Sequence, residues 1–585
     1  MDDKDWGIMS LKEEIHMNIV EDNRSRWLAS PRVSDEDKAT ILSMDEESKN
    51  DAFFKDVELG TAGMRGKLGP GTNRMNLHTV GRVSVAFAMY VLSTDPNARQ
   101  KGIVIAHDNR YFSREFAELS AKIFNEMGFK AYLFDALRPT PELSFAVRYL
   151  GTQGGVMITA SHNPKEYNGY KVYDETGCQL IPSKAEEMLR CASSLPDELS
   201  FEVPAFEKKG ETIILSSKVD DEYCALVKTC QRNPDLDKKG FKVVYTPQHG
   251  ASYENAMRVF EDCGYEIIPV ESQCNHDPAF GGTKSPNPEV AVAWEKVFET
   301  MKENHADLGV MTDPDGDRCG VAYLSSKGTY ERFTGNESAA LLIDYLLDDM
   351  QKKGELPEDA VIYDTIVTSS LGRIVAASYG VKSESFLTGF KFIGDRIAHY
   401  EKLGKGPTFV FGYEESYGCL VKPFVRDKDG LQAILLYTEM ALYYHRLGIP
   451  LDVAFDRLQQ KHGYHLALTK DAYFEGMEGA SKMKAMMEGL RVSPLTEIAG
   501  IKVEKTSDYL AQETIDASGK KETILGLPKS DVMKYFLEDG STVCVRPSGT
   551  EPKVKFYIEA VSKQKEGLLK LVEKLDQGIR SAAMK

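Results

Sequence analysis

Several features are missing from this sequence. No apolar run approaches the ~20 residues that a membrane-spanning helix needs. The start at Met1-Asp2-Asp3-Lys4-Asp5-Trp6 is acidic and lacks the basic and then apolar pattern of a signal peptide. The nine cysteines are odd in number and include no C-x-x-C pair, which predicts reduced thiols and argues against a cysteine zinc site. We therefore expect a cytoplasmic protein.

Basic residues are fewer than acidic residues. The chain has 72 Lys and Arg residues against 89 Asp and Glu residues, a formal net charge of -17. This balance disfavours nucleic acids and anionic membranes as partners. A protein this acidic can bind phosphates only if its basic residues gather around the ligand, so local groups of Lys and Arg carry more information here than the net charge.

Length and periodicity indicate several domains. A chain of 585 residues is too long for one core, and three to five domains are expected. Short apolar segments alternate with amphipathic ones in three successive stretches, which predicts three related α/β domains with mixed, mostly parallel sheets. The predicted strands are 101–108, 130–135, 155–159, 241–246, 265–270, 307–312, 360–364, 383–387 and 408–411. The predicted helices are 112–128, 141–150, 252–263, 288–305, 336–353 and 431–447.

The two ends of the chain differ from this pattern. The C-terminal stretch predicts a smaller α+β domain. It has two strands, at 541–545 and 554–560, joined by a tight loop and followed by a helix at 562–583. The first ~45 residues resemble a helical extension. We therefore predict an extension at 1–45 and domains at 46–205, 206–322, 323–450 and 451–585.

Three loops follow predicted strands directly. Ser161, Asp313 and Glu414 each lie just beyond the C-terminal end of a strand. In open α/β sheets ligands bind at that edge. Three similar domains that each present such a loop are expected to face one central cleft.

The loop after the strand at 307–312 predicts a cation site. Asp313, Asp315 and Asp317 alternate along it, so all three carboxylates can turn toward one ion. An EF-hand is excluded because its sixth position is Arg318 instead of glycine and its twelfth is Leu324 instead of glutamate. Hard cations such as Mg²⁺ prefer oxygen ligands of this kind.

The loop at 159–164 allows two interpretations. Ser161 either carries a phosphoryl group or belongs to an ordinary turn rich in Ser, Asn and Pro. Lys171, ten residues further on, is a proton carrier if neighbouring cations lower its pKa, and otherwise a solvated lysine.

Three further loops carry polar groups. Glu414 and Ser416 suit hydrogen bonding to sugar hydroxyls, although the same residues also fit a capped helix start. The loop at 546–553 is dense in donors and favours a phosphate nest over a simple hairpin turn. The loop at 60–66 presents Arg65 between glycines but matches neither a Walker loop nor a G-x-G-x-x-G fingerprint.

In their order along the chain, these loops resemble those of the α-D-phosphohexomutase superfamily, and most closely its phosphoglucomutase/phosphomannomutase family. Supporting segments lie at 246–250, 285–289, 388–391 and 427–430, so the resemblance spans nearly the whole chain. It implies a phosphoserine at Ser161 and Mg²⁺ ligands at Asp313, Asp315 and Asp317, with the phosphoserine at Ser161 supplying a further oxygen ligand to the ion. The other implied roles are a general acid/base for Lys171, phosphoryl contacts for Arg65, Arg318 and His162, sugar or substrate contacts for Glu414, Ser416 and Lys391, and phosphate contacts for Arg546, Ser548, Gly549, Thr550 and Lys553. His249 is expected only to support the cleft.

The resemblance also implies an activity. It is the interconversion of α-D-glucose 1-phosphate and glucose 6-phosphate, with Mg²⁺ and glucose 1,6-bisphosphate as cofactors, by a monomer or weak dimer whose partners are small sugar phosphates. Glu414-Glu415-Ser416 resembles the glucose-type pattern, while pentose and mannose phosphates stay as alternative substrates. Tyr413 stands where many relatives have glycine, which puts the geometry of the sugar loop in question. A metal-dependent phosphatase would not need the loop at 546–553, and a non-catalytic relative would not need Ser161 and the three aspartates.

Overall fold

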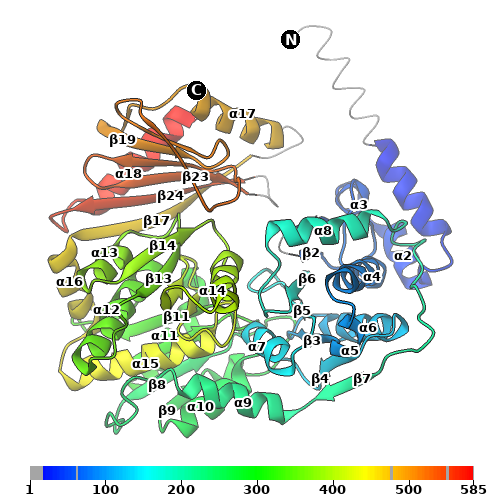
Figure 1. The fold of residues 1–585 in the computed structure, drawn as a ribbon, viewed down its shortest axis with the longest axis horizontal. Coiled ribbons are helices and arrows are strands. Elements are labelled where there is room, and N and C mark those ends of the chain that lie inside the picture. Colours follow the sequence, from blue (N-terminus) through cyan, green and yellow to red (C-terminus); the bar gives the residue numbers. More distant parts are fainter. Residues whose placement is uncertain (1–16, 61–62, 475–478, 549–552, 584–585) are drawn as a thin grey trace.

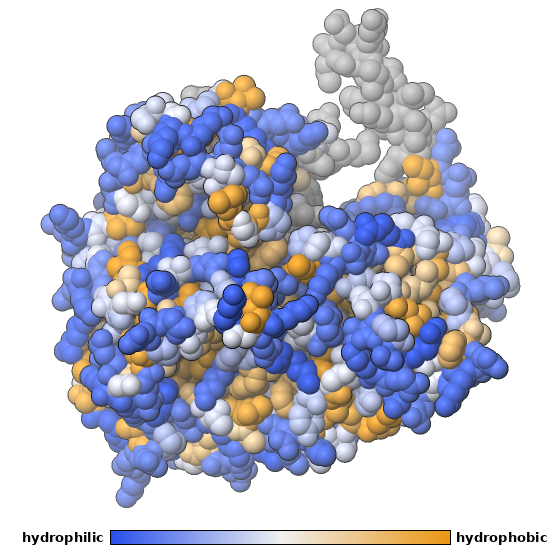
Figure 2. Space-filling model, viewed as in Figure 1, coloured by the Kyte–Doolittle hydropathy of each residue, from blue (hydrophilic) through white to orange (hydrophobic). Residues whose placement is uncertain are grey.

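The computed structural model describes residues 17–60, 63–474, 479–548 and 553–583, which form four sheets and the helices that cover them (Figure 1). All nine cysteines lie in these ranges as free thiols, as predicted. Within the same ranges no helix is long and apolar enough to cross a membrane. The space-filling view shows a mostly hydrophilic face that is hollowed between the C-terminal sheet and the first domain (Figure 2).

The N-terminal segment is helical. Residues 17–29 form one helix, followed by α2 (Asp35–Ser43) and α3 (Glu46–Phe53). Trp27 and Phe53 are fully buried there and pack together with Leu199 of the first domain. This segment is therefore docked on the first domain through its own small core.

The first sheet has seven strands in the order β1-β2-β6-β5-β3-β4-β7. Its strands are β1 (Leu59–Gly60), β2 (Gly63–Lys67), β3 (Ile103–His107), β4 (Ala131–Phe134), β5 (Gly154–Ile158), β6 (Tyr167–Asp174) and β7 (Thr212–Leu215). Its helices are α4 (Leu77–Thr94), α5 (Ala98–Lys101), α6 (Ser113–Glu126), α7 (Thr140–Leu150) and α8 (Pro182–Ser193). β3 is buried on both faces: Ile103 and Ile105 meet the core under α4 and α6, while Val104 and Ala106 meet the core under α7. Burial on both faces explains why β3 is a continuous apolar run in the sequence.

The second and third sheets are smaller and share helix packing. The second has the order β12-β11-β10-β8-β9 and the third β14-β13-β15-β16. Their strands are β8 (Lys242–Thr246), β9 (Glu266–Pro269), β10 (Leu308–Thr312), β11 (Cys319–Leu324), β12 (Tyr330–Arg332), β13 (Ala360–Thr365), β14 (Lys382–Phe386), β15 (Thr408–Tyr413) and β16 (Cys419–Leu420). Their helices are α9 (Ser217–Lys228), α10 (Tyr253–Asp262), η1 (Glu271–Gln273), η2 (Ala291–Trp294), α11 (Glu295–Asn304), α12 (Gly335–Lys353), α13 (Leu371–Ser378), α14 (Lys391–Leu403), α15 (Gly430–Arg446) and α16 (Leu451–His462). α15 packs on β10 and β11 as well as on α12, so these two domains have one continuous core.

The C-terminal sheet is antiparallel, in the order β17-β24-β23-β22-β19-β20-β21, with β18 paired to β19. Its strands are β17 (Tyr464–Tyr473), β18 (Glu497–Ile498), β19 (Ile501–Asp508), β20 (Glu513–Asp516), β21 (Lys521–Thr523), β22 (Met533–Leu537), β23 (Thr542–Pro547) and β24 (Lys553–Ser562). Its helices are α17 (Gly479–Val492) and α18 (Leu568–Ala583). The predicted α+β domain at this end is confirmed.

The structure corrects several predicted limits. β7 extends the first sheet to Leu215 and β12 extends the second to Arg332, past the limits predicted at 205 and 322. α16 packs on α12 and α13, so the third domain continues past residue 450. The helix predicted to start at 562 begins at Leu568, because β24 stays paired with β17 as far as Ser562, which lies opposite Tyr464. The helix predicted to start at 288 begins only at Ala291, because Asn287 closes a turn by accepting the amides of Glu289 and Val290.

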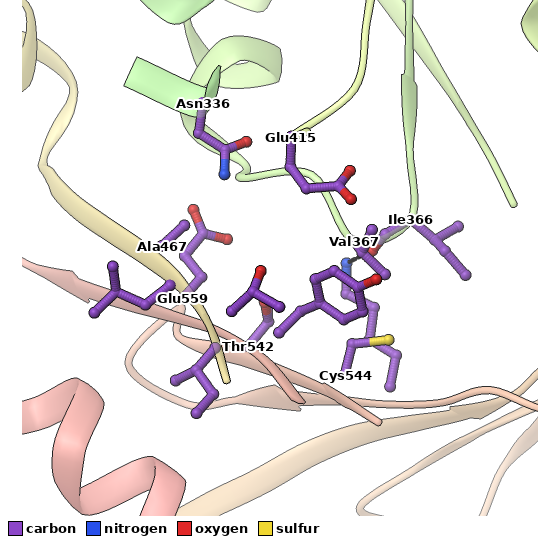
Figure 3. A pocket seen from close by; sticks show the side chains of 13 residues that line it. Asn336, Ile366, Val367, Glu415, Ala467, Thr542, Cys544 and Glu559 are labelled. Carbon is purple, nitrogen blue, oxygen red and sulfur yellow. Dashed lines mark hydrogen bonds between the residues drawn. The ribbon is translucent and has the colours of Figure 1, made fainter. Parts of the chain in front are cut away.

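The third domain and the C-terminal sheet meet around a buried carboxylate. Glu559 of β24 accepts hydrogen bonds from Ser369 Oγ (2.7 Å), the Ser370 amide (2.9 Å) and His465 Nδ1 (3.0 Å). Lys534 Nζ of β22 donates to the Ile366 carbonyl at 2.6 Å. The interface also contains a small cavity of about 20 Å³, lined by Glu559 and Glu415 among others (Figure 3). Polar contacts around Glu559 therefore join the two domains, together with an apolar cluster that includes Ile366, Val367, Tyr509 and Tyr557.

We expect Glu559→Gln to destabilise the C-terminal domain by about 2 kcal/mol at pH 7, because hydrogen bonds to a charged group are lost. Burial raises the pKa of Glu559, but His465, Ser369 and Arg373 outweigh it and lower the pKa from its ordinary 4.5 to about 2. Its contribution to stability is therefore complete above pH 4.5 and is lost as the pH falls toward 2. Urea unfolding across this pH range tests both points.

The exposed Glu566→Gln is the matched control and should change the free energy of unfolding by less than about 0.5 kcal/mol. A Glu559→Gln variant as stable as the wild type at pH 7 contradicts this interpretation. So does a difference between the two proteins that grows on acidification.

Candidate active site

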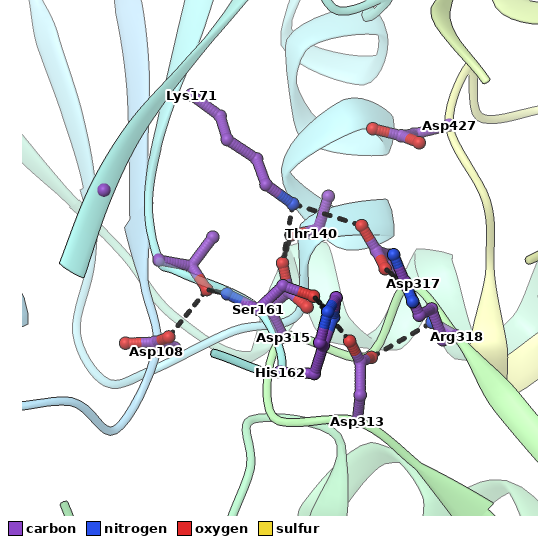
Figure 4. Close-up of polar contacts among 12 residues, drawn as sticks. Asp108, Thr140, Ser161, His162, Lys171, Asp313, Asp315, Asp317, Arg318 and Asp427 are labelled. Atoms are coloured by element: carbon purple, nitrogen blue, oxygen red, sulfur yellow. Dashed lines mark hydrogen bonds and ion pairs between the residues drawn. The ribbon is translucent and has the colours of Figure 1, made fainter. Parts of the chain in front are cut away.

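Ser161 lies in a tight loop beyond β5. The residue is 3% exposed and its backbone has a left-handed φ of 51°. Its amide donates to Thr159 Oγ1 at 2.8 Å, and its hydroxyl donates to Asp313 Oδ2 at 2.7 Å (Figure 4). The His162 Nδ1 atom is 3.3 Å from the same hydroxyl oxygen. The serine of the first domain thus points directly at the carboxylate loop of the second.

The three aspartates form one buried cluster at the end of β10. One carboxylate oxygen from each of Asp313, Asp315 and Asp317 lies within 4.8 Å of the others. Burial, followed by the charges of Asp315 and Asp317, raises the pKa of Asp313 well above its ordinary value. Asp315 Oδ1 and Asp317 Oδ1 are buried and have no hydrogen-bond partner among the described residues. Three close carboxylates with two orphaned oxygens fit a hard cation, so the cluster is suited to bind a metal ion.

Two lysines balance part of this negative charge. Lys171 Nζ lies 2.7 Å from Asp315 Oδ2 and 3.1 Å from Asp317 Oδ2, and Lys428 Nζ lies 3.1 Å from Asp317 Oδ2. Burial lowers the pKa of Lys171, but the two carboxylates outweigh it and the net shift is upward. The premise that neighbouring cations lower this pKa is therefore wrong, because its nearest charged neighbours are anions.

Two arginines, Arg318 and Arg65, lie near the aspartate cluster and Ser161. The Arg318 amide donates to Asp313 Oδ1 at 3.0 Å, and its guanidinium pairs with Glu289 at 2.5 Å. Arg318 Nε has no hydrogen-bond partner in the described part of the chain and lies 4.0 Å from Asp317 Oδ1, so it faces the aspartate cluster. Arg65 is exposed and donates to the Asn163 side chain at 3.0 Å, beside Ser161. Burial, with Arg318 and Arg65 adding to it, lowers the pKa of His162 well below its ordinary value, so its imidazole is neutral.

Glu414 comes directly after β15, as predicted. It is 6% exposed, and its Oε2 lies 4.0 Å from Lys428 Nζ, which connects it to the aspartate cluster. Burial raises the pKa of Glu414, although Lys428 opposes this shift. Ser416 is partly exposed in the same loop. A carboxylate and a hydroxyl therefore lie next to the charged centre.

The neighbours of Glu414 point elsewhere. Glu415 accepts a hydrogen bond from Thr365 Oγ1 at 3.2 Å and faces the interface with the C-terminal sheet (Figure 3). Tyr413 is accommodated by Gly372, where a Cβ atom would come within 2.1 Å of the Tyr413 hydroxyl. The tyrosine at this position thus packs against α13, at Gly372.

The predicted phosphate loop is described only in part. Gly549 and Thr550 lie outside the described residues. Arg546 lies near the end of β23, and Ser548 directly follows that strand. The Ser548 amide donates to the Lys553 carbonyl at 2.8 Å. Lys553 Nζ lies 3.6 Å from Asp471 and 5.7 Å from the ring centre of Tyr473, both on β17. Lys391 begins α14, and burial lowers its pKa to about 8.

The sequence interpretation missed residues that contact this centre. Thr140 Oγ1 donates to Asp315 at 3.0 Å, and Asp108 accepts from Thr159 Oγ1 at 2.6 Å. Arg110 contacts the backbone of the Ser161 loop. Asp108 and Arg110 follow β3, so the strand-end rule that singled out Ser161 could have found them. His249 Nδ1 is 2.8 Å from the Asn275 carbonyl and its Nε2 accepts the Gly282 amide, which is the supporting role expected.

Comparisons with known proteins agree with this architecture. Residues 56–196, 221–325 and 334–460 match the α/β/α domains I, II and III of phosphoglucomutase/phosphomannomutase, and residues 491–573 match its C-terminal domain. The chain is 36% identical over 512 residues to a phosphoglucomutase of Staphylococcus aureus, covering 87% of this chain and 90% of that protein. It is 35% identical over 515 residues to the phosphoglucomutase of Staphylococcus epidermidis, covering 88% and 92% of the two.

Solved structures share the fold. A Paramecium phosphoglucomutase, pp63/parafusin in an open form, has a TM-score of 0.66 at 18% identity over 90% of this chain and 95% of its own. A phosphoglucomutase/phosphomannomutase family protein from Burkholderia thailandensis has a TM-score of 0.63 at 18% identity over 89% and 97%. The four matched domains, their order and these relatives all agree: the chain belongs to the phosphoglucomutase/phosphomannomutase family.

Proposed function

We propose that this protein is a phosphoglucomutase that interconverts α-D-glucose 1-phosphate and glucose 6-phosphate through a phosphoserine at Ser161 and a glucose 1,6-bisphosphate intermediate. The observation that carries the proposal is the 2.7 Å contact between Ser161 Oγ and Asp313 Oδ2, at the edge of three buried carboxylates. A hydroxyl so close to a cation site, with Arg318 beside it, is what phosphoryl transfer requires, because positioning and charge supply most of its catalysis. The names of the Staphylococcus relatives support glucose phosphate as the substrate.

Mg²⁺ is the cation that we assign to this site. Asp313, Asp315 and Asp317 would hold it, and the orphaned oxygens of the last two are free to do so. When bound, it supplies positive charge next to the transferring phosphoryl group. Lys171 and Lys428 now satisfy two of these carboxylates, so the ion would share the charge balance with them.

The chain's own residues divide the remaining tasks. In the first transfer the bond from phosphorus to Ser161 Oγ breaks and a bond to O6 of glucose 1-phosphate forms. The O6 proton ends on the serine oxygen. We assign Lys171 as its carrier because of its place at the aspartate cluster, and not because of a lowered pKa, since its pKa is raised. Arg318 and Arg65 steady the phosphoryl group, and the half-buried, neutral His162 lies 3.3 Å from the serine oxygen.

The second transfer uses the same groups after the bisphosphate has turned over in the cleft. Ser161 then takes the phosphoryl group from O1 and glucose 6-phosphate leaves. Glu414 and Ser416 read the sugar hydroxyls in either orientation, with Lys391 nearby. The loop from Arg546 to Lys553 holds the phosphate that is not being transferred, which is why a mutase needs a second phosphate site and a phosphatase does not.

The substrate is tested by a coupled assay with Mg²⁺ and a trace of glucose 1,6-bisphosphate. We expect turnover of glucose 1-phosphate to exceed that of ribose 1-phosphate and mannose 1-phosphate. Ser161→Ala should lower the rate on the order of 10⁴-fold or more, because the nucleophile is lost, while the exposed Ser493→Ala should not change it. Faster turnover of ribose or mannose 1-phosphate would contradict glucose 1-phosphate as the preferred substrate. Release of inorganic phosphate would contradict the mutase reaction itself.

The cation site is tested by thermal unfolding with and without Mg²⁺. We expect Mg²⁺ to raise the melting temperature of the wild type, and Asp315→Asn to abolish that shift by removing a ligand. Without Mg²⁺ this variant should be less stable than the wild type, because Asp315 pairs with the buried Lys171 at 2.7 Å and the amide of asparagine cannot replace that charge. The exposed Asp235→Asn should keep the full Mg²⁺ effect. An Asp315→Asn protein that Mg²⁺ still stabilises as much as the wild type would contradict the assignment.

A further inference from the structure

The loop that carries Ser161 cannot hold its shape through its own hydrogen bonds alone. Ser161 has a left-handed φ of 51°, a conformation that L-residues adopt at a cost. Pro164 has no amide to donate, and the carbonyls of Ser161, Asn163 and Pro164 turn away from the solvent toward the protein interior, where they need donors.

Arg110 supplies those donors. Its Nη2 donates to the carbonyls of Ser161 and Asn163, the latter at 2.6 Å. Its Nη1 donates to the carbonyls of Pro164 (2.8 Å) and Tyr167 (3.0 Å). One planar guanidinium therefore gathers four carbonyls of one loop, a task that suits its rigid fork of donors and that the single ammonium of lysine cannot reproduce.

The guanidinium is itself fixed from two domains. Its side chain is fully buried, and Nε lies 3.2 Å from Asp108 Oδ2, the atom that also accepts from Thr159 Oγ1. The ring of Phe280, in the long loop of the second domain after η1, lies 5.1 Å from the guanidinium. Asn109, the preceding residue, donates to the Asp277 carbonyl of that same loop at 3.0 Å. The second domain thus covers Arg110 and also carries the aspartate cluster.

We propose that Arg110 is a positioning residue that sets Ser161 Oγ against Asp313 and so fixes the phosphoryl-carrying atom relative to the cation site. It acts through the backbone and touches no reacting atom. Because Phe280 of the second domain covers Arg110, the Ser161 loop is fixed relative to the domain that carries the aspartate cluster. This role rests on the proposed function, in which Ser161 carries the phosphoryl group.

The test is the rate at which dephosphorylated protein takes up a phosphoryl group from glucose 1,6-bisphosphate, followed by rapid quench and intact mass. We expect Arg110→Lys to slow this step on the order of 10- to 100-fold, since displacements of about 1 Å cost this much. The bisphosphate concentration for half-maximal rate should change less than about threefold, because Arg110 contacts no ligand. The matched control is Arg114→Lys, a half-buried arginine on α6 that pairs with Glu118 and donates to the carbonyls of Phe134 and Asp135, away from the Ser161 loop.

Hydrogen–deuterium exchange provides a second readout. Amides of residues 159–167 should exchange faster in Arg110→Lys, while those of β3 and β5 keep the wild-type rate. Phe280→Leu removes only the ring that covers the guanidinium, and we expect it to slow phosphoryl uptake about threefold in the same direction.

The outcomes separate the two proposals. If wild-type Ser161 takes up no phosphoryl group, the proposed function fails. If the wild type does so and Arg110→Lys keeps the wild-type rate, the positioning role is overturned. It is also overturned if the half-saturating concentration rises while the maximal rate stays constant. Should Arg110→Lys fail to fold, an unchanged uptake rate in Phe280→Leu overturns the role instead.

Discussion

The rest of the site depends on one hydrogen bond between two domains, from Ser161 Oγ to Asp313 Oδ2 at 2.7 Å. It joins the carboxyl edges of the first two sheets, and it brings a nucleophilic oxygen against three buried carboxylates that repel one another. Such a cluster is stable only with compensating positive charge. Lys171, Lys428 and Arg318 supply part of it, and a bound cation would supply more. This arrangement explains how a protein with a net charge of -17 can receive doubly charged phosphates.

The third domain adds two buried carboxylates, Glu414 and Asp427, and one lysine, Lys428, to this centre. Glu414 is linked to it through Lys428, while its neighbour Glu415 faces the C-terminal sheet. The C-terminal sheet is attached to the third domain through Glu559 and Lys534, in contact with residues 366–370. The loop of Glu414 and Glu415 therefore lies between the charged centre and the C-terminal sheet.

Much of this was predictable from the sequence, for physical reasons. Strands buried on both faces, such as β3 and β10, are uninterrupted apolar runs, and polar loops at their ends stand out against them. The strands that are antiparallel to their neighbours, β6, β11 and β16, were not predicted, because no helix precedes them and the α/β alternation does not mark them. The position of Arg110 at the end of β3 could have been singled out from the sequence, but its contacts with backbone carbonyls could not, because they depend on how the Ser161 loop folds. The position of Lys171 was predicted, but the direction of its pKa shift was not, since that depends on the two aspartates that the fold brings to it.

The most direct test of the account is a single turnover of labelled phosphoenzyme. The protein is labelled at Ser161 with radioactive phosphate, freed of excess reagent and mixed with unlabelled glucose 1-phosphate in the presence of Mg²⁺. The account predicts that the label leaves Ser161 and appears in glucose 1,6-bisphosphate and glucose 6-phosphate, with no burst of inorganic phosphate. Label that stays on the protein, or that is released as inorganic phosphate, would contradict it.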